Sequence, residues 1–475
     1  PRVVPRRLVP AFVLVLAATA VPGSAAEPVR PGARVEAGDG IGDPYFPLDG
    51  NRGIDVLHYD IRDRYDLRTR RLSGRTTLSV RATEPLARFH LDLLLPVTSV
   101  TVDGAPAAYT KPHQHEVRIT PAAPIAAGDR FTVTVAYAGK PGPLRYAGEA
   151  NWLASRHEVV AMNEPHMAPW WFPSNDHPRD KAAYDIRITT GAKLDVIANG
   201  RQVGRTRKGA LATTHWRSTE PMASYLAFFA AGDFAVRRGR AGRIPWVVAV
   251  SERLPDRLRS SSMRTLLRTG RITSWLQREL GPYPFGSTGG LVTSLNPGFA
   301  LENQTRPTYP ALSSGNHAIV VHELAHQWFG NSVSVHGWRD IWLNEGFATY
   351  LEWRYAEAHG GRSTREQLLA DHRRFRDDDS FWAVPLDDPG ARRIFAYPVY
   401  QRGGMALAAL RRVIGDADFR TLLRRWASEH RYGNATTDQL VELAESVSGR
   451  QLDTFFDAWL RADEAPARTA ANGLD

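Results

Sequence analysis

Cysteine is absent from this chain of 475 residues. Its absence excludes disulfide-stabilised scaffolds, thiol nucleophiles, iron–sulfur clusters and zinc sites made of thiolates. Any metal ion must therefore be held by histidine, aspartate or glutamate. With 43% hydrophobic and 10% aromatic residues, the composition is that of an ordinary globular protein. The length is sufficient for two or three domains with sizeable cores.

Lysine is scarce, so the net charge of +10 rests almost wholly on arginine. The arginines are scattered among acidic residues. Their densest run, residues 237–243, lacks the interleaved aromatic residues of a nucleic-acid-binding module. We therefore interpret the basic residues as solvated surface and expect no nucleic-acid partner.

Long apolar runs are also lacking beyond residue 26. The first 26 residues combine Arg2, Arg6 and Arg7 with an apolar stretch over 8–20 and with small residues at 24–26. That stretch is too short to span a bilayer, which takes about 20 residues, and it predicts a signal peptide over 1–26. We expect a secreted, extracellular protein with no stable membrane anchoring after signal removal. An uncleaved membrane anchor is the alternative.

Alternating patterns dominate the chain up to about residue 240. Residues 27–44 are rich in glycine, proline and aspartate and predict an irregular lead-in. Short alternating runs separated by turn residues then predict the strands of a mainly antiparallel β domain over 45–240. The expected strands are 54–61, 75–80, 88–94, 116–120, 131–137, 184–190, 194–199 and 225–236.

Helical periodicity follows a last strand-like run at 244–250. The expected helices are 257–280, 316–329, 341–359, 404–414, 416–428, 437–447 and 452–460. Gly415 and Gly449 stand where helix-ending glycines belong. The fold class is therefore multidomain α and β, with the β domain followed by a mostly helical domain over 241–460 and a C-terminal tail over 461–475.

The strongest local pattern is the run His322-Glu323-Leu324-Ala325-His326. On a helix, residues four apart project from one face, so both imidazoles can bind one ion while Glu323 lies beside it. The pattern is typical of zinc peptidases. Two helix histidines without a ligand are the alternative.

A catalytic zinc needs a third protein ligand and one open position. Glu345 follows His326 after 18 intervening residues, and glycines within 330–340 allow the chain to reverse and return Glu345 to the metal. The metzincin arrangement of glycine and a third histidine is not present at its required spacing. Glu352 lies two turns after Glu345; it either orients a histidine ligand or is a solvated helix charge.

Together these residues resemble the gluzincin aminopeptidases, the aminopeptidase N and leukotriene hydrolase family. The first matching feature is HELAH, followed after 18 residues by the E of NEGFATY. Three further segments correspond to motifs of that family: 299–303 to Gly-Ala-Met-Glu-Asn, 400–403 to Tyr-x-Lys-Gly, and 171–178 to Phe-Pro-Cys-x-Asp-x-Pro. The resemblance covers about 45–460. It implies an antiparallel, saddle-like β domain followed by a thermolysin-like, mostly helical zinc peptidase domain, with one zinc per chain.

The resemblance also implies a role for each matching residue. The metal ligands would be His322, His326 and Glu345, and the catalytic residues would be Glu323 as general base and Tyr400 as oxyanion donor. The substrate-binding residues would be Glu302, Glu164, Asn303 and Ala300, with the two acids pairing with a free α-ammonium group. Phe299, Leu301 and Arg402 depart from the family pattern, and we expect them to alter the substrate pocket more than the chemistry.

These observations predict a secreted zinc aminopeptidase that hydrolyses the N-terminal bond of peptides with a free N-terminus. A thermolysin-like endopeptidase would share the zinc site and is distinguished by its cleavage of blocked peptides. A non-catalytic binding module that carries zinc is a further alternative, against which the intact Glu323 and Tyr400 argue.

Overall fold

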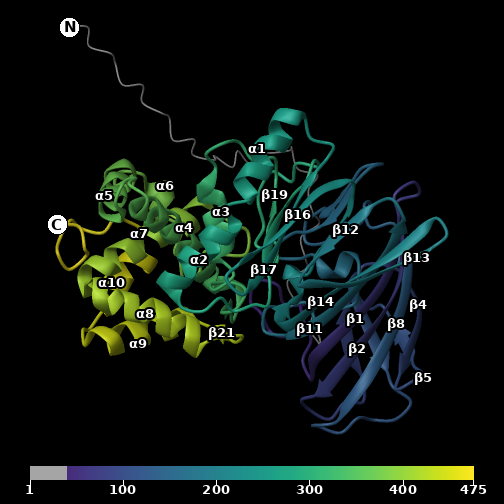
Figure 1. The fold of residues 1–475 in the computed structure, drawn as a ribbon. Coiled ribbons are helices and arrows are strands. Elements are labelled where there is room, and N and C mark those ends of the chain that lie inside the picture. Colours follow the sequence, from purple (N-terminus) through teal and green to yellow (C-terminus); the bar gives the residue numbers. More distant parts are fainter. Residues whose placement is uncertain (1–39) are drawn as a thin grey trace. The chain divides into compact units, whose positions relative to one another are not determined.

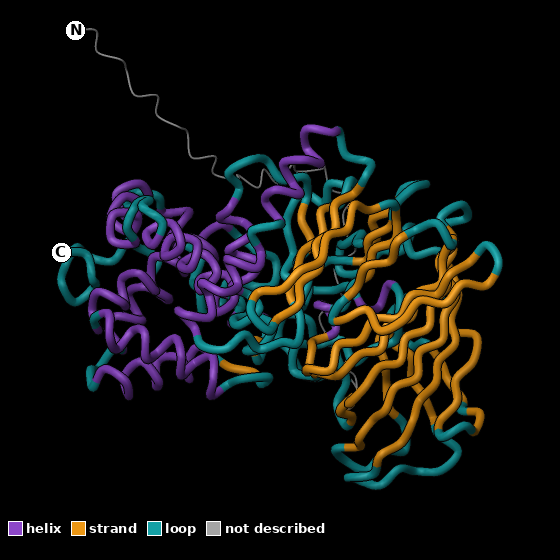
Figure 2. The backbone as a smooth tube through the Cα atoms, viewed as in Figure 1, coloured by secondary structure: helices purple, strands orange, loops and turns teal. Residues whose placement is uncertain are grey.

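The computed structural model describes residues 40–475. The signal peptide expected over 1–26 and most of the expected lead-in lie outside the described residues. Within residues 40–475, no helix is both long enough and apolar enough to cross a membrane. The expected order of a β-rich part followed by a mostly helical part is confirmed, as Figure 2 shows in orange and purple.

The largest element of the β-rich part is an eight-stranded sheet (Figure 1). In sheet order its strands are β13 (Arg201–Lys208), β14 (Leu211–Ala223), β11 (Lys181–Gly191), β1 (Ile54–Asp66), β2 (Arg71–Ala82), β8 (Arg130–Gly139), β4 (Val97–Val102) and β5 (Ala105–Pro106). Strand β1 alternates between buried and more exposed residues, and a register shift between Val56 and His58 keeps Tyr59 and Ile61 on the buried face. The expected antiparallel pairing has one exception, because β1 and β11 run parallel. They are joined by the intervening strands instead of a hairpin.

Two smaller sheets complete the β-rich part. One has the order β3 (Phe89–Asp92), β7 (Glu116–Thr120) and β6 (Ala108–Thr110). The other has the order β12 (Asp195–Ala198), β15 (Phe229–Gly232), β10 (Val159–Ala161) and β9 (Trp152–Ala154). The buried Trp216 of β14 donates its indole N–H to the carbonyl of Val196 in β12, 3.0 Å away, and so joins this sheet to the large one. Single helical turns lie at Ala168–Trp170 and Ser224–Leu226.

The second part begins with a mixed sheet. Its order is β16 (Phe234–Ala241), β17 (Ile244–Ser251), β18 (Thr288–Val292) and β19 (Thr308–Tyr309). Strand β17 coincides with the expected strand at 244–250, whereas β18 and β19 were not expected. A short pair, β20 (Ser334–Val335) and β21 (Asn434–Ala435), lies among the helices.

The helices follow most of the expected ranges. They are α1 (Asp256–Leu266), α2 (Thr269–Leu280), α3 (His317–Ala325), α4 (Trp342–Ala358), α5 (Thr364–Phe375), α6 (Asp379–Trp382), α7 (Tyr397–Ile414), α8 (Asp416–Glu429), α9 (Thr437–Ser448) and α10 (Asp453–Phe456), with short turns at Trp338–Asp340 and Asp457–Arg461. The single helix expected over 257–280 is wrong: the chain breaks between α1 and α2. There the amide of Arg268 bonds to the carbonyl of Thr265, three residues back, which tightens and ends the helix.

Helix α4 packs against both α3 and α7, in the central region of the second part (Figure 1). The approach of α4 to α7 depends on two glycines. A Cβ atom added to Gly403 would lie 2.8 Å from the Cα atom of Gly346, closer than real Cβ contacts occur. Glu345 directly precedes Gly346 on α4, and Tyr400 lies three residues before Gly403 on α7. The close approach of the two backbones therefore brings Glu345 and Tyr400 near each other. Gly415 (φ 88°) and Gly449 (φ 65°) end α7 and α9 as expected.

Candidate zinc peptidase site

The two motif histidines lie at the C-terminal end of α3. His322 is in its last turn, and His326 is the residue that follows the helix. Both side chains are buried, and their ring centroids are 4.7 Å apart. The uninterrupted run of helix-compatible residues before them places both imidazoles on one face, as the spacing predicts.

Glu345, in the first turn of α4, meets both histidines. Its Oε2 atom lies 3.1 Å from Nε2 of His322 and 3.5 Å from Nε2 of His326. Ligands at about 2.1 Å around a tetrahedral zinc are about 3.4 Å from one another, so the three atoms fit one ion. Burial would raise the pKa of Glu345, but the two imidazoles outweigh it and lower this pKa to about 2, which leaves an anionic ligand.

The other nitrogen of each imidazole has its own partner. Nδ1 of His322 lies 2.6 Å from Oε1 of Glu352, and Nδ1 of His326 lies 3.0 Å from the carbonyl oxygen of Phe329. A proton on each Nδ1 satisfies these acceptors and leaves the Nε2 lone pairs for a metal. Of the two interpretations of Glu352, the structure therefore supports the orienting acid.

Further carboxylates lie beside the histidines. One donor atom each from Glu302, Glu323 and His326 lie within 4.8 Å of one another. Burial and the repulsion of Glu302, Glu345 and Glu323 raise the pKa of Glu164 well above its usual value. Oε1 of Glu164 and Oε1 of Glu302 are buried and accept no hydrogen bond among residues 40–475. The site thus concentrates negative charge and favours cations.

Two tyrosines border this acidic region. The ring of Tyr400 stacks near that of His322, with centroids 6.0 Å apart. Tyr225 is buried, with Glu302, Glu164 and Glu345 as its charged neighbours. Burial and the surrounding carboxylates raise the pKa of both hydroxyls well above their usual value, so both stay protonated and can donate. The sequence assigned no role to Tyr225, because a single tyrosine is indistinguishable from a packing residue.

Residues that follow α3 hold the backbone of Glu302 in place. The carbonyl of Glu302 accepts hydrogen bonds from the side chains of Gln327 (3.1 Å) and Asn331 (2.8 Å), and its carboxylate lies near His326. Asn303 is buried and donates to the carbonyl of Leu226 at 3.2 Å, which is a scaffold contact. Ala300, two residues before Glu302, is half-buried.

Arg402 does not fit the expectation that it alters the substrate pocket. Its side chain is fully buried and donates to four backbone carbonyls, those of Trp459, Trp382, Val384 and Ala462. The guanidinium also lies over the ring of Trp382, 4.8 Å from its centroid. Arg402 therefore ties α7 to the C-terminal segment. Leu301 is buried and pairs with Thr308, while Phe299 is half-buried.

Comparison with known families agrees with this site. The description "Peptidase family M1 domain" matches residues 290–459, and "Peptidase M1 N-terminal domain" matches residues 56–226. The chain belongs to peptidase family M1, which confirms the resemblance found in the sequence.

Several curated relatives are named aminopeptidases. Aminopeptidase N of Lactococcus lactis subsp. cremoris is 25% identical over 448 residues, which are 87% of this chain and 51% of that protein. The mitochondrial aminopeptidase 2 of Saccharomyces cerevisiae is 25% identical over 339 residues, 67% of this chain and 35% of that protein. The chain thus spans about half or less of the length of these relatives.

Solved structures of similar length also match. An M1 zinc metallopeptidase mutant from Deinococcus radiodurans, bound to a Tyr-Ser-Ala substrate, is 29% identical and superposes with a TM-score of 0.82 over 90% of this chain and 99% of that one. The unmutated protein from the same organism gives a TM-score of 0.80. The expected cofactor, zinc, is confirmed by the family and by these neighbours.

Proposed function

We propose that this chain is a zinc-dependent aminopeptidase that removes the N-terminal residue of peptides. His322, His326 and Glu345 hold the metal. A zinc ion held there supplies a Lewis acid that lowers the pKa of a bound water from 15.7 to about 7. The four remaining polar groups of the site, Glu323, Tyr400, Glu302 and Glu164, perform the other steps.

Proton transfer falls to Glu323. Its carboxylate lies within 4.8 Å of His326 and Glu302, so it adjoins both the metal ligands and the substrate acids. It accepts the proton of the attacking water and passes it to the departing amine. Tyr400, beside His322, donates its hydroxyl hydrogen to the oxyanion that forms at the scissile carbonyl.

The observation that carries the exopeptidase proposal is the buried pair of acids beside the metal ligands. Glu302 and Glu164 each present a carboxylate oxygen that accepts no hydrogen bond among residues 40–475. An α-ammonium group between them would neutralise the repulsion and satisfy both oxygens. A peptide anchored at its amino terminus so close to the metal can be cut only after its first residue.

The test compares a free peptide with its N-acetylated twin on wild type, Glu302→Gln and Glu302→Ala. Acetylation removes the charge that the acids recognise. We expect wild type to cut only the free peptide. Each Glu302 variant should lose about 2–4 kcal/mol in kcat/KM on that peptide, which is the cost of breaking a desolvated charge pair.

Glu464→Gln is the matched control, because Glu464 is an exposed acid outside the site. It should leave kcat/KM unchanged. Equal cleavage of both peptides by wild type, with internal bonds broken, would contradict the proposal and favour a thermolysin-like endopeptidase.

Export belongs to the same proposal. It is supported by the basic, then apolar, then small-residue pattern over 1–26, which lies outside the described residues. Expression with these residues should give mature protein in the medium with an N-terminus near residue 27. Protein retained in the cell with residues 1–26 still attached would contradict secretion.

A further inference from the structure

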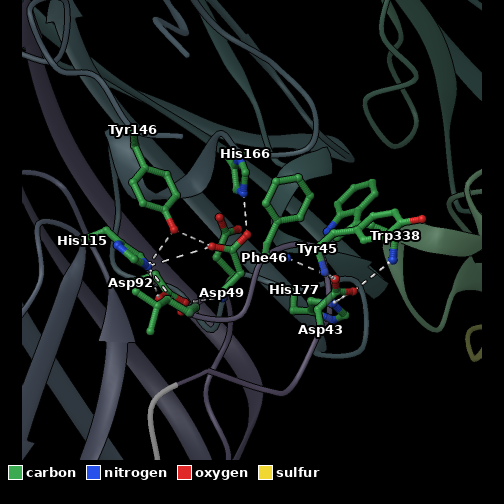
Figure 3. Close-up of polar contacts among 12 residues, drawn as sticks. Asp43, Tyr45, Phe46, Asp49, Asp92, His115, Tyr146, His166, His177 and Trp338 are labelled. Atoms are coloured by element: carbon green, nitrogen blue, oxygen red, sulfur yellow. Dashed lines mark hydrogen bonds and ion pairs between the residues drawn. The ribbon is translucent and has the colours of Figure 1, made fainter. Parts of the chain in front are cut away.

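A second group of buried acids and histidines lies in the β-rich part, outside the peptidase site. It consists of Asp49, Asp92, His115 and Glu116, here called the Asp92 cluster. Asp92 ends β3 and Glu116 begins β7, and the register of the two strands sets them opposite each other. Figure 3 shows Asp49, Asp92 and His115 pointing toward one another.

The distances within the Asp92 cluster are those of a metal site. Nε2 of His115 lies 3.5 Å from Oε1 of Glu116, 3.7 Å from Oδ1 of Asp92 and 4.0 Å from Oδ1 of Asp49. The ligands of a tetrahedral zinc are about 3.4 Å apart. In the peptidase site the corresponding separations are 3.1 Å and 3.5 Å, so the two groups have similar dimensions.

The buried oxygens of the cluster lack sufficient partners. Asp92 and Glu116 are 0% exposed and His115 is 2% exposed. Oδ1 of Asp92 and Oε1 of Glu116 accept no hydrogen bond from any of the described residues. Carboxylates directly opposite each other in a sheet repel, and burial without compensation adds to the cost.

A single proton on His115 cannot satisfy these oxygens. Nε2 of His115 also lies 3.1 Å from the hydroxyl of Tyr146 and 3.3 Å from the carbonyl oxygen of Leu48. One N–H donates to one acceptor at good geometry. A cation at the centre would instead attract all the carboxylates and use the Nε2 lone pair.

The outer oxygens of Asp92 and Asp49 are held by other residues, and Oε2 of Glu116 lies 3.3 Å from Nδ1 of His90. Oδ2 of Asp92 accepts from the amide of Asp176 (2.7 Å) and from the side chain of Asn51 (3.2 Å). Oδ2 of Asp49 pairs with Nε2 of His166 at 2.5 Å, a contact drawn in Figure 3. Such outer contacts orient ligands toward a metal. Oδ1 of Asp92 is thereby aimed at His115, whereas Oδ1 of Asp49 also accepts from the hydroxyl of Tyr146 at 2.7 Å.

We propose that Asp92, His115 and Glu116 bind a divalent transition-metal cation in a site separate from the peptidase centre, with Asp49 beside them. One imidazole with carboxylates suits zinc better than calcium, which prefers oxygen ligands alone. Because its three ligands are buried within the β-rich part, the site is structural. It stabilises the pairing of β3 with β7.

The first test counts metal in the full-length protein. After equilibration with buffered Zn²⁺ and gel filtration, wild type should hold two zinc ions per chain. Glu345→Ala should hold one, because only the peptidase ion is lost. His115→Gln should also hold one while keeping its peptidase activity. His113→Gln, an exposed histidine two residues away, is the matched control and should hold two.

A single zinc per chain in wild type, unchanged in His115→Gln, would overturn the proposal. Should His115→Gln fail to fold, wild-type crystals answer the question directly. Anomalous diffraction at the zinc edge should show a peak beside Nε2 of His115 as well as one beside His322. A peak at His322 alone would mean that Asp92 and Glu116 share a proton, and the metal site would be wrong.

Discussion

At the scale of single residues, Glu323 separates metal binding from turnover. In Glu323→Gln the side chain keeps its size and hydrogen-bonding capacity but cannot accept the proton of water. We expect zinc content to stay at the wild-type level while kcat falls on the order of 10²- to 10⁴-fold. Metal analysis and steady-state kinetics on one preparation check both statements. Near-normal turnover would remove Glu323 from the role of base.

Tyr400 provides a second prediction at this scale. Tyr400→Phe deletes one hydroxyl beside His322, so it should lower kcat by roughly 10²- to 10³-fold with little change in KM. Tyr397, three residues earlier on α7, is 41% exposed. Tyr397→Phe should retain wild-type kinetics. The opposite result for the two variants would assign the oxyanion donor to Tyr397.

The sequence predicted that His322, His326 and Glu345 lie together, because their positions follow from local rules. Helical spacing relates His322 to His326, and a short reversal returns Glu345. Tyr225 could not be found in this way, since its proximity to Glu302 brings together distant segments. The surroundings of Arg402 could not be found for the same reason: its four carbonyl partners come from segments that sequence proximity does not reveal.

At the scale of elements, the contact between α4 and α7 is the most sensitive to volume. Gly403→Ala would place a Cβ atom 2.8 Å from Gly346 and push the helices apart. We expect a loss of about 1–3 kcal/mol in unfolding free energy and a drop in kcat, because Tyr400 moves with α7. Denaturant titration and kinetics measure the two effects. Gly204→Ala, where an added Cβ meets nothing within 4 Å, should change neither.

The large sheet contains a charge network centred on Asp185 of β11. Burial would raise the pKa of Asp185, but hydrogen bonds from His215, Arg217 and His58 outweigh it and lower this pKa to about 2. Its usual value is 3.8, so the ionised form is stabilised in the folded state. This stabilisation is fully present above about pH 4 and is lost as the pH falls toward 2.

Asp185→Asn should therefore lower Tm at pH 6, and the difference from wild type should shrink as the pH falls from 4 to 2. Melting curves at several pH values test this. A constant difference across that range would show that the loss comes from altered packing.

Element types were more predictable than element ends. The runs at 116–120 and 437–447 match β7 and α9 closely, because alternation and a glycine stop mark them. Helix α5 was missed, although Ser363 and Glu366 form a capping box at its start. Strand β18 is short and glycine-rich, and β19 is a short run that stands apart from other strand-like sequence. Both pair through tertiary contacts that local sequence patterns do not contain.

At the scale of the whole molecule, many hydrogen bonds among residues 40–475 join the β-rich part to the helical part. The half-buried Lys181 at the start of β11 donates to the carbonyl of Gly433 at 2.7 Å. Asn434 donates to the carbonyl of Pro178 at 2.9 Å. Asp43 accepts from the backbone amide of Trp338 at 3.0 Å and from His177 at 3.0 Å (Figure 3). Neither part is therefore expected to behave as a fully independent module.

The parallel pairing of β1 with β11 bears on how the chain is made. During synthesis β1 and β2 can form a hairpin as soon as both have left the ribosome, but the other edge of β1 must wait for residues 181–191. Pairing over such a sequence distance is slow. Until then the nascent chain exposes the backbone of a 13-residue strand, a ready template for association with other chains. Fragments that end before β11 are accordingly expected to aggregate, whereas chains extended past β14 can pair both edges of β1 within one molecule.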